Sequence, residues 1–201
     1  MPEPPDGEAD LRDLSANFQR AERYCSALLV EAATGARHTP TKLALARLAD
    51  LRRLDLKQPV ASAYLHQHPK GRPDAVRDLA GSLAKRLDNG AQVASDSVRT
   101  SFKAVTPDNI DEHITAAVVA AVDARGIRWS LGRWADMNTQ TLGRQATSRG
   151  VADRAGQGRT VTIDAGECAY CQEFAGDAVI GQDPLPPYHP TCSCTATAAE
   201  S

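Results

Sequence analysis

Aromatic side chains are scarce in this chain: they make up 4% of its 201 residues. Sandwiches and barrels of strands favour aromatic and β-branched residues, whereas alanine, leucine, valine and arginine dominate here. This composition favours closely packed helices. The sequence also lacks any run of eighteen apolar residues, which argues against a membrane-spanning helix and against a membrane partner.

Neither sign of charge is in large excess. The formal net charge is −2 and the sequence pI is about 6.2. A protein that coats DNA normally has a basic footprint, so this balance argues against that class. The opening residues Met1 to Asp6 have neither the basic region nor the apolar stretch of a secretory signal peptide. We therefore expect thiols that remain reduced in the cytosol.

Recognisable catalytic motifs are also missing. The sequence has no phosphate-binding P-loop, no GxSxG nucleophile motif and no HExxH metal-binding motif. Asp108, Asp111 and Glu112 cluster at an expected helix start, where acidic side chains complement the positive end of the helix dipole. We therefore predict that the protein is not an enzyme and has no small-molecule substrate.

What the sequence does contain, over most of its length, is helical periodicity. Apolar residues recur at intervals of three and four and predict a helical body over residues 8–149, after a disordered N-terminus at 1–7. Cys25 lies on the first apolar stripe and is interpreted as a buried, inert thiol. The heptad-like stripes also suit docking onto helices of another protein. Helices are expected over about 9–33, 40–56, 74–105 (with a weak point at Asn89-Gly90), 108–125 and 128–148, and a connection over 57–73.

The periodicity changes near the C-terminus. Glycines predict a linker at residues 150–158, and residues 159–198 contain two segments, 160–164 and 195–197, that alternate like paired strands. The expected fold class is therefore mainly α, with a multi-helix body and a small C-terminal β-ribbon that a zinc ion staples together. A unit this small has almost no core of its own and generally needs such a staple.

The predicted metal ligands all lie in this ribbon. They are Cys168, Cys171, His189, Cys192 and Cys194. Thiolates and an imidazole suit a tetrahedral Zn²⁺ site, and the two-residue spacers of CxxC and HxxC let both side chains face one ion. Cys192 is the expected fourth ligand, with Cys194 as its alternative. Disulfides or a redox-active CxxC pair are the competing interpretations; against the redox pair, no βαβ pattern surrounds the motif.

The same tail resembles a known protein family. Together with a preceding helix, it is similar to the C-terminal signature of the Mu F-like minor head proteins of tailed bacteriophages. Ser193 departs from that pattern, because the family usually has arginine between the last two cysteines. The matching segments are Val161–Asp164, Glu167–Cys171, Ala175-Gly176, Pro186–Cys194 and the helix Trp129–Thr141.

The resemblance implies a structural role. It implies a low-copy virion protein inside the phage head, made in the host cytoplasm, that associates with the portal protein and with the major capsid or scaffold protein. It also implies a part in head morphogenesis or DNA delivery, with at most weak contact with packaged DNA.

Two other classes compete with the structural role. One is a zinc-ribbon module that binds nucleic acid and dimerises through its helices, but the loop between Cys171 and His189 has Glu173, Asp177 and Asp183 and no lysine or arginine. That acidity argues against phosphate contact. The other is a nuclease with a zinc-braced core, which lacks a general base beside the expected metal site.

Overall fold

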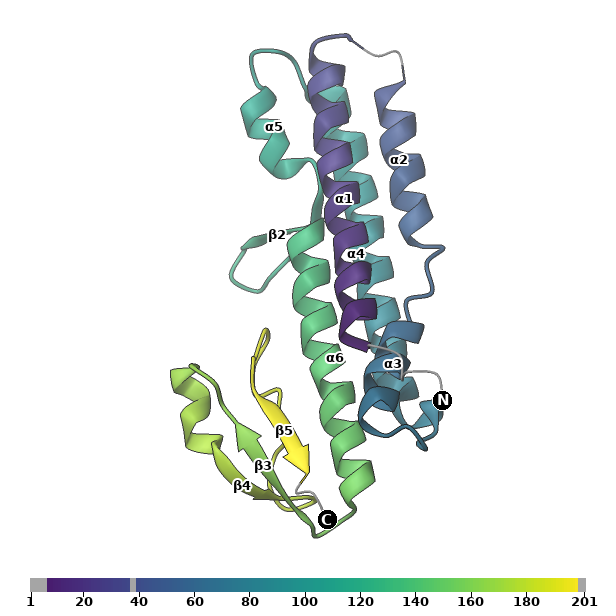
Figure 1. Ribbon diagram of the computed structural model, residues 1–201. Helices are drawn as coiled ribbons and strands as arrows, with labels where there is room; N and C mark the ends of the chain where they lie inside the picture. Colours follow the sequence, from purple (N-terminus) through teal and green to yellow (C-terminus); the bar gives the residue numbers. More distant parts are fainter. Residues whose placement is uncertain (1–6, 37–38, 199–201) are drawn as a thin grey trace. The chain divides into compact units, whose positions relative to one another are not determined.

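The computed structural model describes residues 7–36 and 39–198, so the predicted disordered segment 1–7 lies outside the described residues except for Gly7. The mainly α fold with a small C-terminal sheet is confirmed (Figure 1). None of the helices in the described part of the chain is both long and apolar enough to cross a membrane. The elements in chain order are α1 (Gly7–Ala33), α2 (Pro40–Leu51), α3 (Gln58–Gln67), the 3₁₀ turn η1 (Pro73–Val76), α4 (Arg77–Ala104), α5 (Ile110–Ala116), β1 (Val119–Val122), β2 (Arg128–Ser130), α6 (Leu131–Ala155), β3 (Thr160–Asp164), the 3₁₀ turn η2 (Ala169–Phe174), β4 (Gly176–Val179) and β5 (Thr195–Ala198).

The chain divides into two compact units, and α1, α4 and α6 contribute residues to both. Of the described residues, the bundle unit contains 13–36, 39–55 and 84–136, and the tail unit contains 7–12, 56–83 and 137–198. The predicted domains divide the chain differently, with a helical body at 8–149 and a separate ribbon at 159–198. The sheet belongs instead to a unit that includes α3 and the second half of α6.

The core of the bundle unit uses the apolar stripes that the sequence predicts. Phe18, Cys25 and Leu28 of α1 are at most 2% exposed, and Leu48 of α2 and Leu87 of α4 are fully buried. These buried residues are therefore used within the chain, and docking of the helical region onto another protein stays a prediction. The stripe that predicts a helix over 108–125 is not buried in the same way, since Ile114 and Val122 are exposed. The large apolar side chains exposed in this unit are Tyr24, Val30, Val93, Ile114, Val122 and Ile127.

A β-hairpin replaces the second half of one predicted helix. The stripe of apolar residues predicts a helix over 108–125, but α5 ends at Ala116 and β1 pairs antiparallel with β2. Val118 and Val122 fit an i, i+4 helical spacing, yet β-branched residues also favour strands. Gly126, expected to end the helix, has φ +80 and closes the turn of the hairpin instead.

The Asn89-Gly90 pair does not interrupt α4, which is continuous from Arg77 to Ala104. Gly90 lies where the indole of Trp134 packs: a Cβ added at Gly90 would lie 2.7 Å from the Trp134 ring. The indole N–H also donates to the carbonyl of Arg86 at 3.3 Å. The glycine therefore allows close packing between two helices and does not break one.

Gly150 has the same role within the tail unit. We predict from the sequence that a linker begins there, but α6 continues to Ala155, so this part of the predicted linker is wrong. Residues 58–67, expected to be a connection, form α3. A Cβ at Gly150 would lie 2.6 Å from the backbone oxygen of Tyr64 in α3, so the absent side chain lets α6 approach α3 closely. The connection to the sheet is limited to residues 156–159, in which Gly156 and Gly158 have positive φ.

The sheet has three antiparallel strands in the order β4-β3-β5. The predicted pairing of the two segments is confirmed, with Ile163 of β3 opposite Ala196 of β5. β4 is an additional strand, with Ala178 opposite Val161. Inward-facing residues of the sheet share one hydrophobic core with Val151 of α6, and Ala152 and Ala155 pack against it. That core contains Val151, Val161, Ile163, Ala178, Ile180 and Ala196.

The close approach at Gly150 predicts an unusual response to alanine. Alanine normally stabilises a helix relative to glycine by about 1 kcal/mol. Gly150→Ala should instead destabilise the protein by about 1–3 kcal/mol, because the added methyl meets backbone that cannot move aside. Gly81→Ala in α4 is the matched control: a Cβ there meets nothing within 4 Å, so it should be neutral or stabilising. Urea unfolding measures both variants, and a Gly150→Ala protein as stable as Gly81→Ala would contradict the packing.

Candidate metal centre

The five predicted ligands lie at one end of the C-terminal sheet. Residues 191–197 alternate between exposed and buried, so Cys192 and Cys194 face the same side as the buried Ala196 of β5. Ala165 continues the inward face of β3 in the same direction. The aliphatic core of the sheet thus continues directly into a second buried cluster of Ala165, Cys171, Cys192 and Cys194.

The ligand atoms form two groups of three that share Cys171. One group is Cys168, Cys171 and His189, and the other is Cys171, Cys192 and Cys194; within each group the ligand atoms lie within 4.8 Å of one another. Cys171, Cys192 and Cys194 are at most 1% exposed, whereas Cys168 and His189 are half-buried. The structure therefore brings together all five residues that the sequence singles out. This cluster can hold a metal ion.

The distances fit a tetrahedral ion of the size of Zn²⁺. Two sulfurs bound to one Zn²⁺ at about 2.3 Å lie about 3.8 Å apart. The Sγ atoms of Cys171 and Cys192 lie 3.8 Å apart. On the other side of the cluster, Cys168 Sγ lies 3.2 Å from Nε2 of His189. All five cysteines are within the described residues, and none of them is in a disulfide.

The imidazole of His189 is oriented for a ligand role. Its Nδ1 lies 2.9 Å from the carbonyl oxygen of Pro190. A carbonyl only accepts hydrogen bonds, so Nδ1 carries the hydrogen, and in the neutral ring the lone pair is on Nε2. Nε2 is also the atom that faces the sulfur of Cys168. Such a backbone partner on the second nitrogen is the usual way in which proteins orient a metal-binding histidine.

The thiols do not share one protonation behaviour. The imidazole of His189, together with the backbone N–H of Cys171, lowers the pKa of Cys168, and the backbone bond to Pro190 and the bond to Cys168 raise the pKa of His189. Burial raises the pKa of Cys171 and of Cys194. Burial also opposes ionisation of Cys192, but backbone hydrogen bonds from Tyr188 and Cys194 outweigh it and lower this pKa to about 7.

The raised pKa values of Cys171 and Cys194 come from the burial of these sulfurs in a space shielded from water. Once one sulfur has ionised, a second or third thiolate beside it would repel it, so Cys171 and Cys194 resist ionisation. A bound divalent cation reverses this balance because it stabilises every thiolate that it contacts. The electrostatics of the cluster therefore favour a cation.

Aromatic rings cover the half-buried side of the cluster. Phe174 and Tyr188 stack with ring centroids 4.1 Å apart, and Tyr170 meets the ring of His189 edge-on at 5.7 Å. Burial, and then the nearby sulfurs, raise the pKa of Tyr188 to about 12. The sequence prediction gives Phe174 no role; in the structure it reaches the site through Tyr188, whose ring packs against the sulfur cluster.

Comparison with models of known protein families, with curated proteins and with solved structures found no match to this chain. The resemblance to the Mu F-like proteins therefore stays a prediction that depends on the tail and the helix before it.

The sharing of Cys171 predicts a hierarchy among cysteine variants. Cys171→Ser removes a ligand from both groups and should weaken Zn²⁺ binding by at least about 100-fold, beyond the range typical of outer-shell changes. Cys168→Ser and Cys194→Ser each affect one group and should cost less. Competition against a chromophoric chelator measures these affinities.

Cys25→Ala is the control for the loss of a thiol. Cys25 lies in the bundle unit, fully buried, and burial raises its pKa to about 12. Its removal should leave the metal content unchanged. Equal losses in Cys171→Ser and Cys25→Ala would show that the cluster does not bind the ion.

Removal of the ion predicts a local response. Because Val151 shares a core with the sheet, a chelator should speed hydrogen exchange in residues 160–198 and also in the last turns of α6. Residues 13–33 of α1 belong to the other unit and should keep their protection. Exchange that rises equally in both segments would contradict this coupling.

Proposed function

We propose that this protein is a structural minor head protein of a tailed bacteriophage, and that its C-terminal cluster binds one Zn²⁺ as a structural ion. The observation that carries the proposal is the cluster itself. The cluster is built from two motifs, CxxC at 168–171 and HPTCSC at 189–194. The resemblance to the Mu F-like proteins rests largely on the same two motifs. Four sulfurs and one imidazole nitrogen exceed the four ligands that a closed structural zinc site needs, so no coordination position is left for a reactive water.

The proposed ion stabilises a sheet with little core of its own. Six buried residues form its aliphatic core, and three of them lie on β3 or β5 next to the sulfur cluster. In zinc-finger peptides, structural Zn²⁺ contributes apparent binding free energies of about 10–16 kcal/mol at pH 7. A structural ion that binds with a free energy of this size would keep the sheet folded while the protein is built into an assembling particle.

The charge of the tail argues for a protein partner over packaged DNA. Residues 160–198 contain no lysine or arginine, and their exposed carboxylates include Glu167, Glu173, Asp177 and Asp183. Such a surface repels phosphate. The proposed contacts with the portal or with the inner capsid wall use the exposed apolar residues of the bundle unit, among them Val122 and Ile127, which are 59% and 46% exposed on the hairpin.

The proposal predicts the location of the protein. Mass spectrometry of phage heads, purified from the source phage and stripped of tails and external proteins, should detect it at a small fraction of the abundance of the major capsid protein. Cross-links should join the β1–β2 hairpin to portal or capsid subunits. Absence from both procapsids and mature heads would contradict the proposal.

Retention on DNA distinguishes the competing class. A zinc-ribbon module that binds nucleic acid would be held on a DNA column in a salt-dependent manner, and Zn²⁺ removal would abolish its retention. The acidic tail predicts instead that the protein passes through at about 0.15 M salt, with or without the ion.

A further inference from the structure

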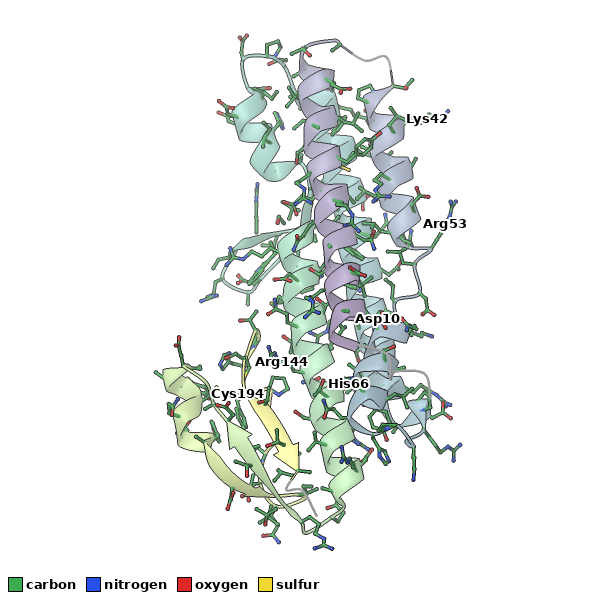
Figure 2. The ribbon with its side chains drawn as sticks, viewed as in Figure 1. Asp10, Lys42, Arg53, His66, Arg144 and Cys194 are labelled. Atoms are coloured by element: carbon green, nitrogen blue, oxygen red, sulfur yellow. The ribbon has the colours of Figure 1, made fainter. Side chains whose placement is uncertain are left out.

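Two contacts join α6 to the loop that carries three of the candidate ligands. A guanidinium N–H of Arg144 donates to the carbonyl oxygen of Ser193 at 3.1 Å. The backbone N–H of Thr191 donates to the hydroxyl of Thr141, one helical turn before Arg144, at 3.4 Å. Figure 2 shows Arg144 directed from α6 toward the segment that contains Cys194. All of these residues belong to the tail unit.

The loop needs such support because Thr191 has a strained backbone. Its φ is +61, the only positive φ at a non-glycine residue in the described part of the chain. For a β-branched residue this conformation is a true outlier, and it persists only where the surroundings hold it. It occurs between His189 and Cys192, where the N–H of Cys192 closes a turn onto the carbonyl of His189 at 3.1 Å. Thr191 therefore lies between two candidate ligands, and its backbone conformation sets where their side chains lie relative to each other.

The hydroxyl oxygen of Thr141 is free of its own hydrogen on the side that accepts the hydrogen bond from the turn. Its own hydroxyl hydrogen is donated to the carbonyl of Met137 at 2.8 Å. The oxygen therefore presents a lone pair to the N–H of Thr191, which would otherwise lack this partner. Arg144 adds a positive charge at the loop, where residues 160–198 provide no lysine or arginine of their own. A site of three or four thiolates around one divalent cation has a net negative charge, which this guanidinium offsets.

We propose that Thr141 and Arg144 are positioning residues of the metal centre: α6 holds the loop 189–194 in the left-handed turn at Thr191 that brings His189 and Cys192 to the CxxC turn. This inference rests on the proposed metal site. It assigns a role to a helix that lies well before the ligands in the sequence, and it makes α6 part of the site.

The test measures metal affinity and coordination geometry in the full-length protein. Thr141→Val and Arg144→Gln should each weaken Zn²⁺ binding by about 10–100-fold, as outer-shell changes typically do. Arg144→Lys should recover part of the affinity, because it restores the charge without the planar fork. Thr191→Gly should bind at least as tightly as the natural protein, because glycine adopts positive φ at no steric cost. The absorption spectrum of bound Co²⁺ should shift in Thr141→Val and Arg144→Gln, a change that general loss of stability would not produce.

Matched controls come from the same helix. Thr147→Val removes a hydroxyl whose bond stays within α6, to the carbonyl of Gly143 at 3.1 Å. Arg154→Gln removes one positive charge from the last turn of α6. Both should bind Zn²⁺ within about twofold of the natural protein. If Thr141→Val and Arg144→Gln also bind within twofold, the positioning role is overturned while the metal centre stands. If the natural protein binds no Zn²⁺ at all, the proposed metal centre itself fails.

Discussion

The crowding of thiols at the end of the C-terminal sheet is the constraint on which the tail depends. Cys171, Cys192 and Cys194 are buried together at the point where an aliphatic core would normally continue. Thiols pack there as small hydrophobic side chains, but each one that ionises makes ionisation of the others more costly. A divalent cation bound among these sulfurs attracts every thiolate that it contacts, and this attraction offsets the repulsion between the thiolates. Residues 191–197 alternate between exposed and buried. The alternation that buries Ala196 therefore also buries Cys192 and Cys194 on the same side.

α6 connects this centre to the rest of the tail unit. Its last turns contribute Val151 to the core of the sheet, its middle contacts the ligand loop through Thr141 and Arg144, and Gly150 allows it to lie against α3. The packing of one helix thus supports the sheet, the loop and α3 together. A metal bound at the loop would be coupled to helical packing, although the ligands themselves are confined to the tail.

The sequence predicts the structure correctly where a single local pattern, such as the spacing of apolar residues, decides the conformation. The stripe through Phe18 and Leu28 predicts a buried helix face, and alternation around Ile163 predicts a strand; both are confirmed. Ligand type and spacing predict the members of the cluster, which the fold brings together. The helix and strand signals are local, because they depend on residues within a few positions of one another, and each half of the ligand set is a short motif of the same kind.

Prediction was wrong where tertiary contacts decide between local alternatives. Gly150 carries the sequence signal of a linker, and only the backbone of α3 shows why a glycine is needed inside a helix. Val122 follows Val118 at a helical spacing, but its pairing with Arg128 of β2 places it in a strand. The positions of Thr141 and Arg144 beside the loop could not be predicted at all, because nothing near them in sequence indicates a metal. Their contacts arise from the way in which the sheet packs on α6.

This arrangement also bears on which part of the chain is free to interact. The apolar stripes are used in the bundle core, and the sheet uses its inward face for its own core and the sulfur cluster. The surface left on residues 160–198 is acidic, with the exposed ring of Tyr170 beside His189, while exposed aliphatic side chains occur on the hairpin. The two units therefore offer different chemistry to a partner. Exposed aliphatic side chains belong to the bundle unit, whereas residues 160–198 of the tail unit contain acidic side chains and no lysine or arginine.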